Sequence, residues 1–187
     1  LAFFDLENAV ELFGLIPAKY GRYGGLTVIT SFFLHAGVIH LLGNLYFLCV
    51  FGDNVEEFLG KRRFFLLLLT SVILGATAHI LWHPDPQIAC VGASGGISGV
   101  ITFYALQFPQ ARLQVVLRVF PYRYRWFAVP AWLLFGIWIL LQMLGTWQQI
   151  CGMSAVSALA HLGGALGGAL FWWAGRSSDP TEDNAAA

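Results

Sequence analysis

Residues 127–147 read FAVPAWLLFGIWILLQMLGTW, a run without a single charged side chain. A helix needs about 20 mostly apolar residues to cross a bilayer, so this stretch is long enough on its own. The rest of the chain agrees, because 58% of its 187 residues are hydrophobic and only 11% are charged. Soluble domains are about 25% charged, so the apolar surplus here must face lipid. The sequence therefore predicts an integral membrane protein.

Four further stretches have the length and apolar character of membrane spans. Together with the first they predict five spans, at residues 38–58, 64–82, 91–109, 127–147 and 154–174. We therefore expect an all-α fold, a polytopic transmembrane helix bundle over residues 38–174. Residues 1–37 are amphipathic and contain the turn-prone stretch PAKYGRYGG, which predicts an outer interfacial loop with short helices. The polar residues 175–187 are expected to form a cytoplasmic tail.

The basic residues predict the orientation of these helices. Eight of the ten Lys and Arg residues fall in three segments, which follow the first, third and fifth predicted spans. Cytoplasmic segments carry such an excess of positive charge, so we assign these three segments to the cytoplasmic side. Trp residues gather near the predicted span ends, as in the aromatic belts of spanning helices. With this orientation Leu1 lies on the outer side, and a further span is expected before it.

Charge and cysteine content narrow the choice of partners and folds. The formal net charge is zero, so no basic surface suggests nucleic acid, and none is expected as a partner. Three cysteines are too few for a disulfide framework. Cys90 and Cys151 both fall near outer span ends, where they could pair with each other or remain two free thiols.

Polar side chains inside the predicted spans are the candidates for a functional site, because placing them in lipid is costly. Three different helices carry such groups at a similar depth in the outer leaflet. The first span has His40 and Asn44, the third has Ser94, and the fifth has His161. His40 and Asn44 are four residues apart and therefore share a helix face. Agreement in depth across separate helices indicates one common site.

These residue types suit nucleophilic catalysis. Ser94 lies in GASGG, where small neighbours let other backbone approach its hydroxyl. The motif also begins a helix, whose free N–H groups and positive dipole end favour a developing anion. Serine is a weak nucleophile until a base takes its proton, and His161 is the natural base. Acyl transfer also needs donors for an oxyanion, which Asn44, His40 and the Ser94 backbone N–H could supply.

Each of these residues also has a structural interpretation. A G-x-S-G sequence in an apolar helix commonly serves close packing, and an Asn in a span often ties two helices together. We interpret His79 as interfacial or structural, and Ser98 and Gln142 as local backbone or helix-contact groups. The glycine pairs of residues 161–168 match small-xxx-small packing, which would bring another helix close to His161.

Four motifs, in this order and at this spacing, resemble the rhomboid proteases. They are SFFLHAGVIHLLGN at 31–44, FGDNVEEFLG at 51–60, VGASGGISG at 91–99 and AHLGGALGG at 160–168. The resemblance extends from about Phe13 to Trp173. It implies that Gly164 and Gly168 bring the histidine helix against the serine helix, and that Glu56 is a structural acid.

The resemblance also implies a role for each candidate site residue. Ser94 would be the nucleophile and His161 the general base, in a dyad without a carboxylate. His40 and Asn44 would line the oxyanion hole. One departure is that certain rhomboids carry a Tyr four residues after the nucleophile, stacked on the base, where this chain has Ser98. Another is that certain rhomboids carry Trp-Arg in the first loop, where this chain reads GLTVIT.

By this resemblance the chain would be an intramembrane serine endopeptidase, acting on single-span membrane proteins near the outer face of the bilayer. No cofactor and no metal are expected. A bacterial inner membrane is the expected location, with the site open to the outer side. The alternative is a rhomboid-like pseudoprotease that binds membrane clients without cleavage, although the chain keeps both Ser94 and His161. A transporter or metal-dependent membrane protease is disfavoured, because the histidines lack the H-E-x-x-H pattern.

Overall fold

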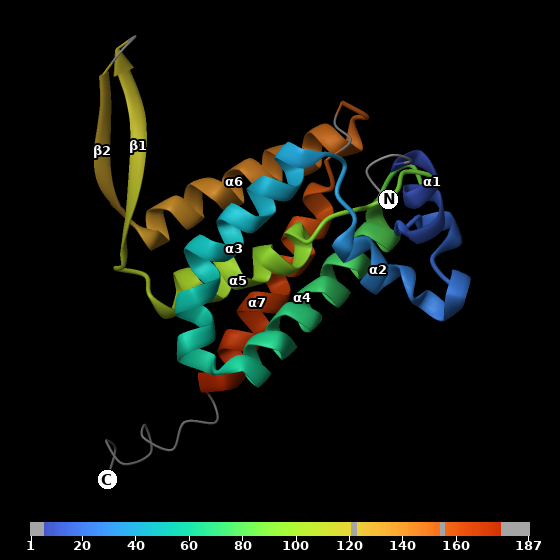
Figure 1. Ribbon diagram of the computed structural model, residues 1–187, viewed down its shortest axis with the longest axis horizontal. Coiled ribbons are helices and arrows are strands. Elements are labelled where there is room, and N and C mark those ends of the chain that lie inside the picture. The colour runs from blue at the N-terminus through green and yellow to red at the C-terminus, as the bar shows by residue number, and fades with distance from the viewer. Residues whose placement is uncertain (1–5, 121–122, 154–155, 177–187) are drawn as a thin grey trace.

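The structure is a computed structural model that describes residues 6–120, 123–153 and 156–176 (Figure 1). Within these residues the chain forms a bundle of helices and one antiparallel hairpin. In chain order the elements are α1 (Leu6–Phe13), the 3-10 turns η1 (Pro17–Lys19) and η2 (Arg22–Gly25), α2 (Thr27–Phe33), α3 (Val38–Leu59), α4 (Lys61–Trp82), α5 (Ser94–Gln107), β1 (Arg112–Phe120), β2 (Arg123–Pro130), α6 (Ala131–Ile150) and α7 (Ala158–Arg176).

Three of the described helices, α3, α4 and α6, are long and apolar enough to cross a membrane. They correspond to the first, second and fourth predicted spans. The third and fifth predicted spans are also helical, as α5 and α7, but α5 has only 14 residues. At about 1.5 Å per residue such a helix is roughly 21 Å long, less than the apolar thickness of a bilayer. The prediction of five spans is therefore supported for three of them.

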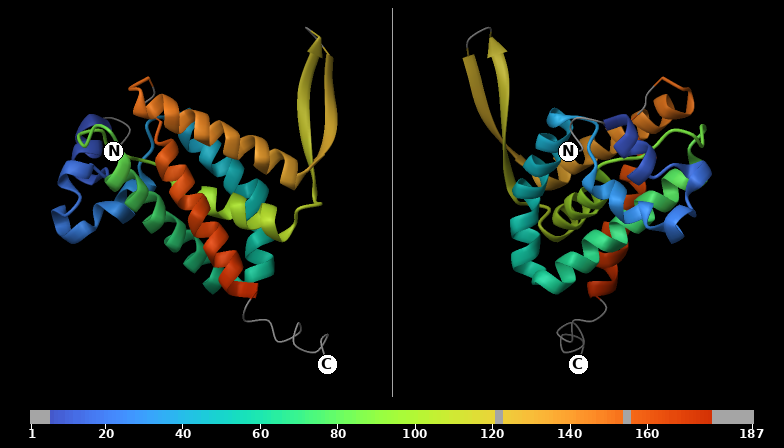
Figure 2. Two further views of the ribbon diagram at one scale, coloured as in Figure 1. Left: turned by 180° about the vertical axis from the view of Figure 1, so that it is seen from behind. Right: turned by 45° about the vertical axis from the view of Figure 1, so that its right-hand side comes forward.

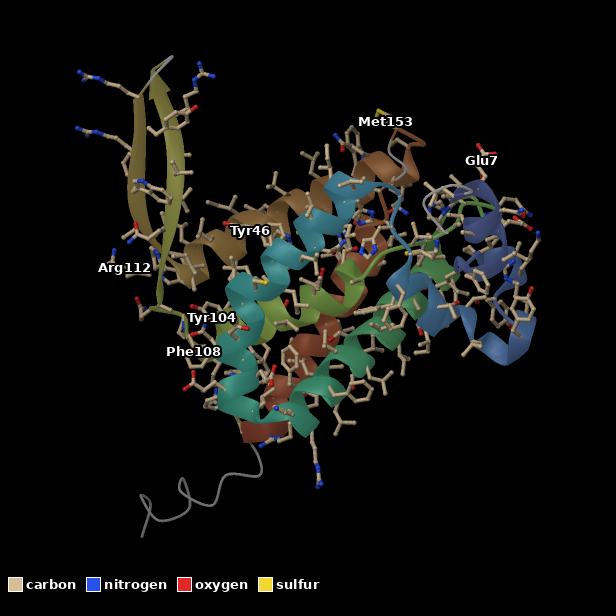
Figure 3. The ribbon with its side chains drawn as sticks, in the orientation of Figure 1. Glu7, Tyr46, Tyr104, Phe108, Arg112 and Met153 are labelled. Atoms are coloured by element: carbon tan, nitrogen blue, oxygen red, sulfur yellow. The ribbon has the colours of Figure 1, made fainter. Side chains whose placement is uncertain are left out.

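The hairpin of β1 and β2 corrects the all-α prediction. The strands pair antiparallel, with Val116 opposite Trp126, and residues 127–130 belong to β2 rather than to the fourth span. Half of the residues of β2 are aromatic or β-branched (Tyr124, Trp126, Phe127 and Val129), and such side chains favour strands. α6 starts only after Pro130, whose ring lacks an N–H and suits a helix start. The hairpin projects from the bundle, with Arg112 at its base (Figure 3).

α5 lies at the centre of the bundle, with α3, α4, α6 and α7 around it (Figures 1 and 2). Every residue from Gly96 to Ala105 is buried. A helix that is apolar on all sides is expected in such a central position. Because α5 is enclosed, its first residue, Ser94, is held by helices on several sides.

α7 packs against its two main neighbours through backbone contacts. A Cβ atom on Gly164 would lie 1.9 Å from the carbonyl oxygen of Gly95 on α5. On the adjacent face of α7, a Cβ atom on Gly163 would lie 2.5 Å from the carbonyl oxygen of Leu74 on α4. Only glycine permits backbones to approach so closely. The prediction of small-residue packing beside His161 is confirmed.

α6 is the most exposed of the long helices. Its buried residues are Ala131 and Gln149, whereas large side chains such as Trp132, Leu140 and Leu141 are exposed. In a chain that crosses a bilayer, these apolar side chains form a lipid-facing surface.

The region from α1 to α2 holds the segment that precedes α5. Leu15 and Cys90 exchange two backbone hydrogen bonds, of 3.1 and 2.8 Å. Arg22 donates side-chain hydrogen bonds to the carbonyl oxygens of Glu11 and Gly14, which ties η2 to α1. The short helices expected in residues 1–37 are present, and they support the backbone leading to Ser94.

Candidate active site

The backbone before Ser94 makes a sharp turn at Gly92. Gly92 has a φ of 118°, which residues with a side chain rarely adopt, and its N–H donates to the carbonyl oxygen of Ser31 at 2.9 Å. α5 then begins at Ser94. The first N–H groups of a helix have no partner inside the helix, so they present positive partial charge near the Ser94 hydroxyl.

His161, in the first turns of α7, contacts that hydroxyl. Its Nε2 lies 2.8 Å from Ser94 Oγ, within hydrogen-bond distance. The two residues are far apart in the sequence, and the close approach of Gly164 to Gly95 brings their helices together. The two residues therefore stand in the geometry that a nucleophile and its general base require.

The other ring nitrogen of His161 is also bonded. Nδ1 lies 2.8 Å from Oε1 of Gln142, which α6 contributes. From the sequence we interpreted Gln142 as a helix-contact group, and its contact with the candidate base was missed. The available signal was its position: it is a polar residue inside a predicted span that has no charged side chain, and such residues usually face the interior.

His40 and Asn44 lie beside the turn at Gly92. A Cβ atom on Gly92 would lie 2.7 Å from Cε1 of His40 and 3.7 Å from Nδ2 of Asn44. His40 Nδ1 accepts a hydrogen bond from the Ala36 N–H at 3.3 Å, so the neutral ring carries its proton on Nε2. Asn44 Nδ2 donates to the carbonyl oxygen of His40 at 3.0 Å and has a second proton to donate.

Five polar side chains from four helices share one cavity. It has a volume of about 790 Å³ and is lined by Ser94, His161, His40, Asn44 and Gln142, among mostly apolar residues. Within the part of the chain that the structure describes, its lining contains no Asp or Glu. The polar residues predicted on three helices thus converge, and α6, a fourth helix, adds Gln142.

Ser98 and His79 have structural contacts, as expected. Ser98 Oγ donates to the carbonyl oxygen of Ser94 at 2.7 Å, which confirms its local backbone role. His79 is fully buried, with Nδ1 2.7 Å from Ser157 Oγ and Nε2 3.2 Å from the carbonyl oxygen of Ile88. Because a carbonyl can only accept, Nε2 donates and Nδ1 accepts from the serine. His79 thereby ties the segment before α5 to α4 and to the start of α7.

The cysteines are free thiols, so Cys90 and Cys151 do not pair. Burial raises the pKa of the Cys90 thiol to about 11, which keeps it protonated and unreactive at neutral pH. Among the described residues, no three His, Cys, Asp or Glu side chains are grouped so that they could hold a metal ion.

The fold and the site together define a class: a membrane-embedded helix bundle with a serine and a histidine in contact inside a cavity. The chain belongs to the rhomboid family, since its residues 24–178 match the rhomboid domain. It is therefore an integral membrane protein.

Named relatives agree with this family. The chain is 32% identical over 156 residues to Rhomboid protein 1, mitochondrial, of Saccharomyces cerevisiae, covering 79% of this chain and 41% of the yeast protein. It is 29% identical over 185 residues to Rhomboid-like protein 11, chloroplastic, of Arabidopsis thaliana, covering 91% of this chain and 58% of that protein. It is 34% identical over 79 residues to Rhomboid protease GluP of Bacillus subtilis, covering 42% of this chain and 16% of that protein.

In each case the chain spans less than two thirds of the relative's length. No solved structure matches the chain. Because the relatives carry mitochondrial and chloroplastic names as well as bacterial ones, the bacterial inner membrane stays a prediction.

Proposed function

We propose that the chain is a serine endopeptidase that cleaves single-span membrane proteins within the bilayer, with Ser94 as nucleophile and His161 as general base. The observation that carries this proposal is the 2.8 Å contact between Ser94 Oγ and His161 Nε2. Two relatives support the class of activity by name, Rhomboid protease GluP and Putative rhomboid protease YdcA, both of Bacillus subtilis.

The proposed reaction has two halves. Ser94 Oγ attacks the carbonyl carbon of the scissile peptide while its proton passes to His161 Nε2. The tetrahedral intermediate then collapses, the C–N bond breaks, and the leaving amine takes that proton. Water attacks the resulting ester with His161 again as base, which releases the acid and restores the serine hydroxyl.

The oxyanion would form beside the start of α5. The proposed donors are the second Nδ2 proton of Asn44, the Nε2 proton of His40 and the Ser94 backbone N–H. Such donors are effective in a site of low dielectric, where they are already oriented before the reaction. The cavity of about 790 Å³ supplies the space for a peptide segment and for the water that the second half requires.

The predicted topology supports the proposed side of cleavage. With the Arg-rich segments in the cytoplasm, the first residues of α5 and α7 lie toward the outer face. A single helix of another membrane protein, unwound near that face, could present its backbone to Ser94.

The test is covalent labelling combined with cleavage. A fluorophosphonate probe and a fluorescent single-span substrate are applied to the wild type, Ser94→Ala, His161→Ala and Asn44→Ala, with Thr70→Ala as a control away from the cavity. Ser94→Ala should abolish both signals, and His161→Ala should be nearly as severe because the pair acts as one unit. Asn44→Ala should slow cleavage by about 10²–10³, the usual effect of losing one oxyanion donor.

Thr70→Ala should match the wild type, since the Thr70 hydroxyl bonds within its own helix, to the carbonyl oxygen of Leu66. A wild-type chain that binds the substrate but neither cleaves it nor takes the probe would instead be a pseudoprotease.

A further inference from the structure

We infer that Gln142 is a positioning residue, which sets the tautomer and the ring orientation of His161. This inference rests on the proposed function, because it assigns Gln142 a part in the same site. It starts from the 2.8 Å contact between Gln142 Oε1 and His161 Nδ1.

The contact determines which ring nitrogen can act as a base. An amide oxygen is only an acceptor, so the imidazole proton lies on Nδ1. Nε2 then keeps its lone pair, and it is this atom that faces Ser94 Oγ at 2.8 Å. With the proton on Nε2, the ring would donate to the serine and could not accept its proton. Gln142 therefore selects the form of His161 that general base catalysis requires.

Among the described residues that line the cavity, none has a carboxylate that could take the place of the Gln142 amide. On α5, the Ser98 hydroxyl donates its hydrogen bond to the carbonyl oxygen of Ser94. On α3, His40 faces the cavity and has its Nδ1 bound to the Ala36 N–H. On α4, Gly75 lies against the backbone of Ala160 and brings no titratable group to the ring.

A second contact holds α6 in register with α7. Gln149 lies two turns after Gln142, on the same face of α6, and its Oε1 accepts a hydrogen bond from the Leu159 N–H at 3.3 Å. The two glutamines thus contact α7 at Leu159 and His161. The contact of the buried Gln149 fixes the position of α6 along its axis relative to α7, and this places Gln142 opposite the imidazole.

The acceptor is neutral, which has a chemical consequence. When His161 takes the serine proton, the imidazolium donates from Nδ1 to an amide oxygen instead of a carboxylate. A carboxylate at this position would stabilise the protonated ring more strongly. The acid side of the pH–rate profile therefore depends on the charge of residue 142.

The experiment compares Gln142→Met, Gln142→Glu and a matched control, Gln148→Met, which makes the same change six residues along α6. Two readouts are taken on the full chain in detergent. One is the fluorophosphonate labelling rate of Ser94 from pH 5 to pH 9, and the other is ¹⁵N NMR of the histidine ring nitrogens. The midpoint of thermal unfolding shows that each variant is folded.

Gln142→Met has a similar shape but only a poor acceptor, so labelling should slow about 10-fold or more, as part of the general base contribution is lost. Its His161 should also lose the pure Nδ1–H tautomer. Gln142→Glu should keep the tautomer and should still react with the probe. The acid limb of its labelling rate plotted against pH should move to higher pH. Gln148→Met should behave as the wild type.

The inference would be overturned if Gln142→Met were labelled at the wild-type rate and kept the tautomer of the wild type. An Nε2–H tautomer in the wild type would also overturn it, because it would mean that the amide donates to the ring. The NMR readout separates this inference from the proposed function. The wild type could show the Nδ1–H tautomer but fail to react with the probe, while Gln142→Met loses that tautomer. In that case the protease assignment would fail, and the positioning role of Gln142 would stand.

Discussion

At the residue scale, the site is built from groups that are neutral when at rest. Ser94 and His161 are joined by one hydrogen bond, and Gln142 adds an amide oxygen behind the imidazole. Ionised groups are costly in a region without bulk water, so a carboxylate partner would carry a desolvation penalty. Under the proposed function, a neutral acceptor would orient the base without that penalty, and the imidazole would be positively charged only during the reaction.

His79 should matter for stability more than for chemistry. From sequence alone, His79 was interpreted as interfacial or structural. In the structure the ring is fully buried and bonds both Ser157 and the carbonyl oxygen of Ile88. Its removal leaves buried groups without partners, at about 1–3 kcal/mol each.

We therefore expect His79→Ala to lower the midpoint of thermal unfolding by several degrees, while the folded fraction still takes the fluorophosphonate probe. Thr77→Ala, on an exposed part of the same helix, is the control and should leave the midpoint unchanged. If folded His79→Ala lost labelling as completely as His161→Ala, the wrong histidine would have been assigned as the base.

At the scale of helices and strands, backbone contact between α5 and α7 sets the distance between Ser94 and His161, the proposed nucleophile and base. Gly164 and Gly168 of α7 lie against the carbonyl oxygens of Gly95 and Gly99 of α5. Any side chain at these positions would force the two helices apart, and Ser94 would separate from His161.

Gly164→Ala should therefore reduce both stability and labelling. Its Cβ atom would lie 1.9 Å from a carbonyl oxygen, too close for any real contact. Gly136→Ala on α6 is the matched control, because nothing lies within 4 Å of the added atom. Both changes gain about 1 kcal/mol of helix propensity, so the difference between them isolates the steric effect. Equal labelling rates and equal unfolding midpoints would contradict the proposed role of the glycine.

The sequence predicted these elements unevenly, for physical reasons. Long apolar runs predicted α3, α4 and α6. The similar depth of the polar residues predicted that Ser94 and His161 lie in one site. The end of β2 was assigned to the fourth span because residues 127–130 are as apolar as the helix that follows, so hydropathy alone could not separate strand from span. The contact of Gln142 was missed because periodicity shows which residues share a helix face but not which helix lies opposite.

For the whole molecule, the central prediction concerns sidedness. A chain without its native cysteines would carry either Pro86→Cys, before α5, or Arg118→Cys, on β1. An impermeant maleimide added to intact cells should label the first and not the second, because basic segments stay in the cytoplasm. Permeabilised cells are the control, in which both should react. The reverse pattern would place the cavity toward the inner leaflet and contradict cleavage near the outer face.

The backbone contact between α5 and α7 also bears on how such a protein can diverge. The spacing of the pair depends on a few positions where a side chain is absent, so it is independent of most of the residues around it. Substitutions on the lipid-facing surface of α6 can accumulate without altering that spacing. We therefore expect this surface to tolerate changes that suit membranes of different composition, while the glycines of α7 tolerate few.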